Sequence, residues 1–432
     1  MKKTLFNTLS ACAILFLITS SSQSQPSRAF TIPNLVTGDA VPGEFIVKLK
    51  SDDGISFLST ENVGRVLGGV VKSKFESDPK LLVLKTDQKI EDVYTELADS
   101  DLVEYVEPNY IYHADKTPND PDYTKTWGIK NGVTADIDIN AEKAWDITTG
   151  SGDVTVAVID TGIDLTHPEL KDNLWANEAE LNGKPGVDDD GNGYIDDIHG
   201  YDFYNNKGDP QDGHGHGSHV SGVIGAKGNN GVGVAGINWN VKIMALKFLS
   251  DEGSGSVADA VRAIDYATNM GAKITSNSWG GSKESQALKE AIQRAADKDV
   301  LFVAAAGNDG ESNDLNGHYP ANFDVANIIS VAAIDKTGAL ADFSNFGLTK
   351  VHIAAPGVDT YSTSKDGGYE TMSGTSMATP HIAGVAALTL SAKKMTMLEL
   401  RKKILASVRP LPSLKDKVAS GGMIDAFKAV SP

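Results

Sequence analysis

Cysteine is almost absent from this chain of 432 residues: Cys12 is the only one, so no internal disulfide can form. Long hydrophobic runs are missing too, since none reaches the roughly 18 residues that a membrane-spanning helix requires, and we expect no stable membrane span. Basic residues are in deficit, with 39 Lys and Arg against 57 Asp and Glu, which disfavours binding to nucleic acids and to anionic membranes. The remaining composition, 41% hydrophobic and 22% charged, excludes a disordered or fibrous chain and fits two or three domains.

The N-terminal segment, residues 1–24, has the layout of a secretory signal peptide. A basic start is followed by an apolar run at 11–18 and by the small residues Ser20 and Ser22. The four residues ending at Cys12 resemble a lipoprotein attachment box, but most of the apolar run follows the cysteine, which is the wrong order. We therefore expect ordinary cleavage near 22–25 and secretion to the extracellular space or a periplasm.

The next segment, residues 42–114, has the pattern of a small α+β unit. Apolar residues alternate as in strands, or recur at helical spacing, in the ranges 44–50, 80–85 and 103–111 for strands and 88–100 for a helix. A polar, Pro-rich stretch at 115–123 follows and is typical of a linker.

From residue 127 onward, predicted strands and helices alternate. Buried strands are predicted at 154–159, 241–249, 272–278, 300–306, 328–334 and 351–355, and amphipathic helices at 256–270 and 285–297. This alternation predicts an α/β fold in which a parallel sheet is sandwiched by helices. In such sheets the functional groups gather at the carboxyl ends of the strands.

Three short segments carry side chains suited to nucleophilic catalysis. Asp160 ends a predicted strand, His216 lies in a glycine-rich segment with three histidines, and Ser376 stands at the start of a small-residue helix. Each residue alone is equally typical of a turn or a helix cap. Together they supply a hydroxyl, a base to activate it and a carboxylate to orient the base. The chain order Asp, His, Ser is one of the known orders of this triad.

The sequence around these residues resembles the three active-site blocks of the subtilisin-like serine proteases (subtilases). The blocks are VIDTGID, HGSHVSG and GTSMATP, and the resemblance extends from about residue 115 to the end of the chain. It implies a serine endopeptidase in which Asp160 orients the imidazole, His216 is general base and then acid, and Ser376 attacks the peptide bond to form an acyl-enzyme. Ser218 stands where Thr is usual in the second block, a change that should not affect the chemistry.

The resemblance also implies binding residues beside the triad. Asn308, in the block AAGN, would donate its side-chain amide to the oxyanion, with the Ser376 N–H as the second donor. The edge that pairs with an extended peptide would comprise Ser278, Trp279, Gly280 and Gly307. Gly280 would leave the specificity pocket wide for large apolar or aromatic side chains, whereas Asp309 at the rim would favour Lys or Arg, and both alternatives stay open.

An acidic segment at 187–212 contains eight aspartates and one lysine. Carboxylates this dense repel one another unless a cation lies between them, and oxygen ligands suit Ca²⁺. Their spacing matches the opening of a D-x-[DN]-x-[DN]-G calcium loop, although His199 stands where the closing Glu is expected. The candidate ligands are Asp188, Asp190, Asn192, Tyr194, Asp196 and Asp197. A solvated acidic loop without metal is the alternative.

Subtilases often carry a further calcium site, built from the mature N-terminus and the loop after the catalytic histidine. By resemblance its ligands are Asp120, Glu169, Asn230 and the main-chain carbonyls of Lys227, Val232 and Val234. Glu169 stands where Asp is usual. Another site found in the family would use Asp202, Asn205, Asp209 and Gln211, but Lys207 occupies a position that is usually acidic there. We therefore expect structural calcium as the cofactor.

The N-terminal unit resembles the inhibitory propeptide of subtilases, notably in PGEFIVKLK and VEYVEPNYIYHA. The resemblance implies that residues 42–114 assist folding, block the cleft and are removed autocatalytically between about Tyr110 and Thr117. The catalytic domain would then span 115–432. The expected partners are protein and peptide substrates and the chain's own propeptide, and we expect a monomer.

Other functions fit less of the sequence. A zinc hydrolase could use His214, His216 and His219, but it would leave Ser376 and Asn308 without a role. An α/β-hydrolase esterase needs its Asp and His after the nucleophile, and only His381 follows. The G-x-G-x-x-G match at 231–236 precedes a strand instead of following one, which disfavours a dinucleotide site. A non-catalytic calcium-binding scaffold would not need an intact triad.

Overall fold

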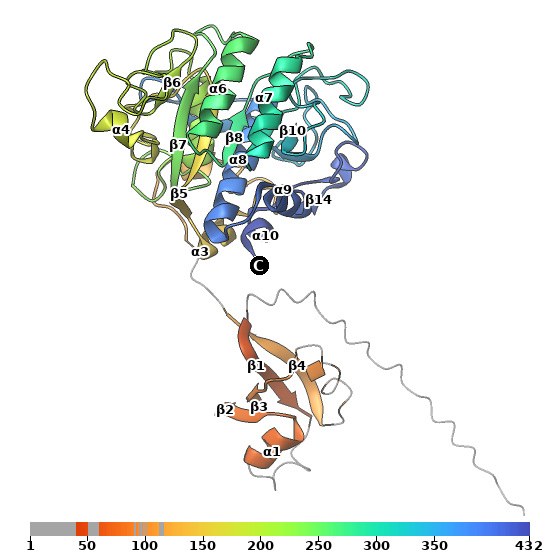
Figure 1. Ribbon diagram of the computed structural model, residues 1–432. Helices are drawn as coiled ribbons and strands as arrows, with labels where there is room; N and C mark the ends of the chain where they lie inside the picture. Colours follow the sequence, from red (N-terminus) through yellow and green to blue (C-terminus); the bar gives the residue numbers. More distant parts are fainter. Residues whose placement is uncertain are drawn as a thin grey trace, which may run out of the picture. The chain divides into compact units, whose positions relative to one another are not determined.

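The computed structural model describes residues 40–50, 60–89, 92, 93, 95, 97, 100, 102–111 and 116–432. The predicted signal peptide at 1–24, with Cys12, lies outside the described residues. The chain forms two compact units, Met1–Tyr112 and His113–Pro432 (Figure 1). Within the described ranges, none of the helices combines the length and apolar character needed to cross a bilayer.

The N-terminal unit is a four-stranded antiparallel sheet in the order β2-β3-β1-β4, with helical residues packed on it. Its elements are β1 (Ala40–Leu49), α1 (Thr60–Val66), β2 (Val70–Phe75), β3 (Asp78–Lys85) and β4 (Val103–Tyr110). Residues 92, 93, 95 and 97 are helical, within the range predicted as a helix. The strand β2 was not predicted, because its mostly exposed side chains lack the apolar alternation of a half-buried strand.

The C-terminal unit contains a nine-stranded sheet in the order β14-β15-β11-β10-β9-β8-β5-β7-β6, parallel throughout except for β14. Its strands are β5 (Gly150–Asp160), β6 (Gly200–Asp202), β7 (Asn240–Lys247), β8 (Ile274–Asn277), β9 (Leu301–Ala305), β10 (Ile328–Ile334), β11 (Ile353–Pro356), β14 (Val408–Pro410) and β15 (Gly422–Ile424). A separate hairpin joins β12 (Thr360–Thr363) and β13 (Tyr369–Met372).

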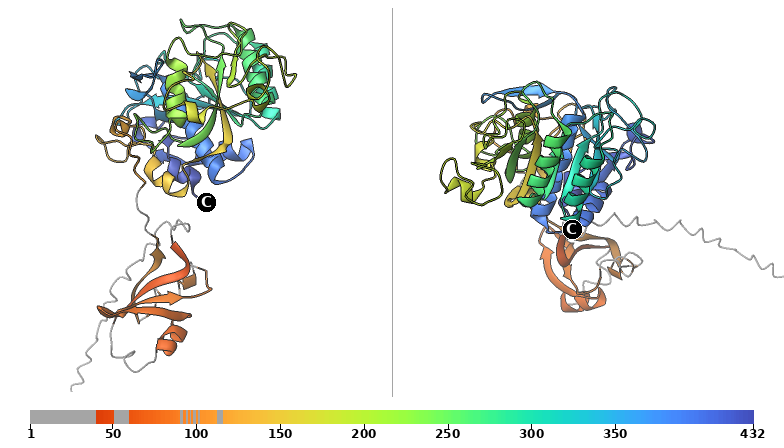
Figure 2. Two further views of the ribbon diagram at one scale, coloured as in Figure 1. Left: turned by 90° about the vertical axis from the view of Figure 1, so that its left-hand side faces the viewer. Right: turned by 45° about the horizontal axis from the view of Figure 1, so that its top comes forward.

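Helices cover both faces of this sheet, so the predicted fold class is confirmed (Figure 2). The helices of this unit are α3 (Ala141–Ile147), α4 (Glu178–Leu181), α5 (His216–Gly225), α6 (Val257–Asn269), α7 (Gln286–Asp297), α8 (Thr375–Ala392), α9 (Met397–Ala406) and α10 (Ala426–Val430), with the short 3-10 helices η2 (Tyr123–Lys125), η3 (Lys171–Asn173) and η4 (Pro412–Leu414). The predicted amphipathic helices correspond to α6 and α7, and serine side chains cap both: Ser256 accepts from Asp259 N–H and Ser285 from Leu288 N–H.

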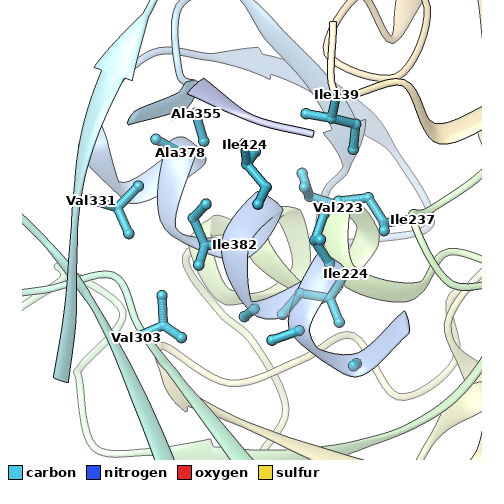
Figure 3. Packing of buried hydrophobic residues seen from close by; sticks show 14 of the residues in the cluster. Ile139, Val223, Ile224, Ile237, Val303, Val331, Ala355, Ala378, Ile382 and Ile424 are labelled. Carbon is cyan, nitrogen blue, oxygen red and sulfur yellow. The ribbon is translucent and has the colours of Figure 1, made fainter. Parts of the chain in front are cut away.

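Each face of the sheet has its own apolar core. Because side chains alternate along a strand, Val156 and Val158 of β5 pack with α5 and α8, whereas Ala157 and Ile159 pack with α6 and α7. Figure 3 shows part of the first core around Ile382 of α8. The helix α8 is buried on nearly every side, which its small residues allow.

The strand order reverses at β5. From β5 the chain builds β6 and β7 on one side, then crosses to β8 on the other and continues outward to β11. Adjacent connections therefore leave the carboxyl end of β5 in opposite directions, which opens a crevice there. Asp160, the last residue of β5, lies at this point.

Candidate active site

Asp160 and His216 form a direct hydrogen-bonded pair. Asp160 ends β5 and is fully buried, and His216 is the first residue of α5. His216 Nδ1 lies 2.7 Å from Asp160 Oδ1, and the same oxygen accepts a hydrogen bond of 2.7 Å from Thr161 N–H. The carboxylate thus fixes the ring orientation and leaves Nε2 as the nitrogen available for proton transfer.

Opposing influences act on the pKa of His216. Burial disfavours the imidazolium, but the charge and hydrogen bond of Asp160, together with the charge of Asp212, outweigh it and raise the pKa above its ordinary value of 6.5. The side chain is still 19% exposed, so it remains accessible to solvent. This arrangement can accept a proton and hold the resulting cation beside Asp160.

Asp212 organises the start of α5, a role that the sequence did not reveal. Its carboxylate is buried and accepts five hydrogen bonds of 2.7–2.9 Å. The donors are the N–H groups of His214, Gly215 and Ser218 and the hydroxyls of Thr161 and Ser218. Because Thr161 also accepts from Gly217 N–H, Asp212 ties the turn after Asp160 to the first turn of the helix that carries His216.

A buried lysine supports the same turn. Lys247 Nζ, at the end of β7, donates to the carbonyl of Thr161 at 2.6 Å and to Asp251 Oδ1 at 2.8 Å. The sequence gave no sign of this contact, because Lys247 and Thr161 are far apart along the chain and meet only when β5 pairs with β7.

Ser376 is the second residue of α8, at the end of the helix where N–H groups are free. Its hydroxyl donates to the carbonyl of Ser278 at 3.0 Å, and the hydroxyl of Ser278 donates to the carbonyl of Ser376 at 2.8 Å. These reciprocal bonds join the helix to the chain that leaves β8. In free proteases, catalytic hydrogen bonds often form only after substrate binds, so this resting contact is compatible with a nucleophile.

Asn308 follows β9 and lies against the start of α8. Its side-chain oxygen accepts from the N–H and the hydroxyl of Thr375, at 2.8 and 3.0 Å, so the amide nitrogen Nδ2 faces the other way. A Cβ on Gly374 would lie 3.6 Å from Ser376 N and 3.7 Å from Asn308 Nδ2. Two N–H donors thus border one small space beside the serine, which suits a developing oxyanion.

The predicted substrate edge follows the carboxyl ends of β8 and β9. Ser278, Trp279 and Gly280 continue from β8, and Gly307 continues from β9. Trp279 stacks edge-on against Phe248 with 4.8 Å between ring centroids, at the wall of a hollow of about 380 Å³. Gly280 also lines this hollow, but the space on its Cβ side is occupied, because a Cβ there would lie 2.4 Å from His318 Nε2.

The three histidines do not converge on a metal, so the zinc alternative is wrong. His216 Nδ1 faces Asp160, His219 Nε2 lies 3.0 Å from the carbonyl of Thr360, and His214 is exposed. Burial lowers the pKa of His219 to about 4, so this ring is neutral in the core. Among the described residues, the only group of three or more His, Cys, Asp or Glu side chains close enough to share a metal is acidic and lies elsewhere.

That cluster joins Glu180 to two residues of the predicted calcium loop. Oxygen atoms of Glu180, Asp188 and Asp190 all lie within 4.8 Å of one another. Glu180, in α4, also accepts hydrogen bonds from the N–H groups of Asp189 and Asp196, so it holds the loop closed. The donor set is all oxygen and fits Ca²⁺. Sequence spacing missed Glu180 because it precedes the loop.

The other predicted ligands of this loop have different surroundings. Asp196 accepts from Gly186 N–H, and the ring of Tyr194 packs edge-on against Tyr201 and Tyr266. Asn192 Nδ2 contacts both Asp190 and Asp197. Burial raises the pKa of Asp197, although three side chains donate to it, namely those of Asn177, Asn192 and Tyr266.

The second predicted calcium site is also brought together. Glu169 is fully buried and accepts from Asn230 Nδ2 at 2.9 Å and Val234 N–H at 3.0 Å, and Asp120 accepts from Asn230 N–H at 3.3 Å. Burial and the nearby charge of Asp120 raise the pKa of Glu169 to about 7. Lys227 and Val232 flank these residues. The Lys227 N–H donates a hydrogen bond to the Glu169 carbonyl, and the Val232 N–H donates one to Asn230 Oδ1. The two carboxylates fit a hard cation. Lys227, Val232 and Val234 contact the site through their N–H groups, so the predicted role of their carbonyls stays a prediction.

The remaining family site is not assembled in the same way. Asp202 accepts from Asn205 N–H and side-chain amide, but Asp209 pairs with Lys207 at 3.2 Å. The side-chain oxygen of Gln211 accepts from Leu165 N–H. The ammonium of Lys207 thus occupies the place of a cation beside Asp209.

Comparison with known proteins agrees with this geometry. Residues 151–422 match the sequence model of the Subtilase family, and residues 26–109 match that of the fervidolysin N-terminal prodomain. The chain is 39% identical over 378 residues to the thermophilic serine proteinase of Bacillus sp. (strain AK1). The aligned region covers 85% of this chain and 82% of that protein. It is 35% identical over 315 residues to thermitase of Thermoactinomyces vulgaris, covering 73% of this chain and 99% of that protein.

The fold has solved counterparts as well. A protease structure from Pseudoalteromonas arctica superposes with a TM-score of 0.61 at 29% identity, covering 73% of this chain and 98% of that one. The chain also matches subtilisin-like proteases of Plasmodium, of which it spans about half the length. The chain therefore belongs to the subtilase family, as a subtilisin-like serine protease preceded by a prodomain.

Proposed function

We propose that the chain is a secreted endopeptidase, made as a zymogen and stabilised by calcium, whose catalytic triad is Asp160, His216 and Ser376. The contact of 2.7 Å between His216 Nδ1 and Asp160 Oδ1, at the carboxyl end of β5, is the observation that carries the proposal. It supplies an oriented base whose raised pKa suits proton transfer near neutral pH.

In this proposal the reaction begins when the Ser376 hydroxyl turns from the Ser278 carbonyl to His216 Nε2. Ser376 Oγ then attacks the scissile carbonyl while its proton passes to His216, and Asp160 stabilises the imidazolium. The oxyanion accepts from Asn308 Nδ2 and Ser376 N–H, which border the space in front of Gly374. His216 returns the proton to the leaving amine, and water hydrolyses the acyl-enzyme by the reverse sequence of transfers.

The substrates would be extended segments of proteins and peptides. The chain from Ser278 to Gly280 continues a strand beyond the sheet, so its main-chain groups can pair with a substrate as an added strand. Gly307, on the neighbouring segment, would form the opposite wall of the pocket for the side chain before the cut bond.

Calcium would stabilise the fold instead of taking part in the chemistry. Glu180, Asp188 and Asp190 would hold one ion, because their oxygens lie within 4.8 Å of one another. Asp120 and Glu169, which are both buried and both hydrogen-bonded to Asn230, would hold another. A bound cation would neutralise carboxylates that otherwise repel one another, and would thereby stabilise the loops that carry them.

The N-terminal unit would act as the inhibitory propeptide, 42–114, and residues 1–24 as the signal peptide. We expect cleavage between about Tyr110 and Thr117 to release a monomeric catalytic domain at 115–432. The match to a prodomain and the folding of this unit around its own core support the assignment.

Replacement of the nucleophile tests the proposal. Purified Ser376→Ala should accumulate as the uncut proform, should not react with a serine-directed phosphonyl reagent and should not cleave casein. Ser391→Ala is a matched control, because Ser391 lies on the same helix and its hydroxyl donates only to the Ala387 carbonyl at 2.9 Å. Normal maturation of purified Ser376→Ala would overturn the assignment of the triad.

A further inference from the structure

One histidine outside the triad lies between the two predicted walls of the substrate pocket. A Cβ on Gly280 would lie 2.4 Å from His318 Nε2, and a Cβ on Gly307 would lie 2.9 Å from His318 Nδ1. The imidazole therefore extends from one glycine to the other. A side chain at Gly280 would meet this ring first, and one at Gly307 would meet both the ring and Asn345 Nδ2, which would lie 2.4 Å from the added Cβ.

The main chain holds His318 firmly in this place. The next residue, Tyr319, pairs with Gly281 through two hydrogen bonds of 2.8 Å, one in each direction. The carbonyl of His318 accepts from Asn322 N–H at 2.9 Å. The backbone of His318 is thus tied to the same segment that would bind the substrate backbone.

The polar surroundings of the ring are sparse. Within the part of the chain that the structure describes, its nitrogens have no hydrogen-bond partner, and its nearest carboxylate is Asp309 with Oδ2 at 3.8 Å from Nδ1. The His318 side chain is 17% exposed and that of Asp309 is 65% exposed, so the ring lies deeper and the carboxylate lies at the rim. Burial lowers the pKa of His318 despite Asp309, and the ring is neutral at neutral pH.

We propose that His318 is a specificity-determining residue whose ring closes the deep end of the pocket between Gly280 and Gly307, so that the enzyme accepts short side chains before the cut bond and rejects aromatic ones. The proposal rests on the proposed function, which supplies the two pocket walls. It also replaces the expectation of a wide pocket, because the space that Gly280 leaves is taken by the imidazole.

The physical reason is volume. A pocket that must shift a packed ring to admit a phenyl group loses binding energy in the transition state, whereas a methyl or hydroxymethyl group needs no such shift. One extra methylene in a fitted pocket changes kcat/KM by about 10- to 200-fold, so discrimination against a whole aromatic ring should reach at least about 100-fold.

The test compares two peptide substrates that differ only in Ala or Phe before the cut bond. The mature wild-type enzyme should favour Ala in kcat/KM by about 100-fold or more, and His318→Gly should raise the Phe:Ala ratio by about 100-fold. Cleavage of the Ala substrate by His318→Gly reports that the variant is folded, and His318→Ala gives a second reading if it is not. Asp309→Asn should leave the Phe:Ala ratio unchanged, because it alters the rim and not the depth.

A wild-type preference for Phe, or a Phe:Ala ratio that neither His318→Gly nor His318→Ala changes, would overturn the proposal. If the wild type cleaves neither substrate nor casein, the proposed protease function has failed instead. The two failures are therefore distinguishable.

Discussion

Asp212 offers a sharp test of how the fold positions His216. The change Asp212→Asn keeps the shape of the side chain but replaces one carboxylate oxygen by an NH₂ group. In the better orientation the amide oxygen keeps the three donors that now reach Oδ1, and the NH₂ faces the N–H and hydroxyl of Ser218. The buried Ser218 N–H then loses its acceptor and points at another donor.

The expected cost follows from these contacts. A hydrogen bond to a charged group is worth about 1.5–3 kcal/mol, and a buried donor left unsatisfied costs about 1–3 kcal/mol. Allowing for partial relaxation, we expect the free energy of unfolding to fall by about 3 kcal/mol. Loss of the Asp212 charge also removes one of the influences that raise the pKa of His216, so the acidic limb of the kcat/KM profile should move to lower pH.

The unfolding free energy can be measured by urea titration in the Ser376→Ala background, which prevents self-digestion. Tryptophan fluorescence reports only the C-terminal unit, because all five tryptophans lie after residue 116. Asp324→Asn is the matched control: Asp324 is 84% exposed and pairs with Lys350, so its loss should cost at most about 1 kcal/mol. Equal stability of Asp212→Asn and Asp324→Asn, with no shift in the pH profile, would refute the reasoning.

Three further outcomes are expected. Asn308→Ala should lower kcat by roughly 10²- to 10³-fold with little change in KM, as loss of such a donor does in subtilisin, a member of the same family. An unchanged kcat would exclude Asn308 from the oxyanion site. Because His216 must be neutral to act as a base and its pKa is raised, kcat/KM should increase with pH through a pKa above 6.5, and a midpoint below 6.5 would contradict this. Calcium at 100 times its Kd should stabilise the protein by about 2.7 kcal/mol, so removal of calcium by a chelator should lower Tm. In Glu180→Gln the chelator should lower Tm by less. Equal Tm values of the unchanged protein with and without chelator would contradict the calcium sites.

Local pattern was sufficient to predict the centre of the fold. The strands β5, β7 and β9 are mostly buried and carry runs of apolar residues, which made them visible in the sequence. Short edge elements such as β6 and β14 were not predicted, because three residues give no periodicity and pairing with a neighbour defines them. Strand order was likewise inaccessible, since it depends on contacts between distant segments.

The site divides in the same way. The proposed triad residues stand in long, distinctive blocks, whereas Asp212, Glu180 and His318 were revealed only by contacts that the folded chain creates. Asp212 was visible beside the histidines, but nothing in its neighbours indicates five donors. His318 had no motif at all, and only its packing between two glycines reveals it.

The order of the elements along the chain also decides when a newly made chain can contain all three proposed triad residues. Asp160 and His216 belong to the early part of the domain, but α8, which carries Ser376, packs across strands that the ribosome makes later. A growing chain thus contains the proposed base long before it contains the proposed nucleophile, because β8 to β11 lie between them in the sequence. Catalysis by the proposed triad therefore requires nearly the whole domain to have been synthesised.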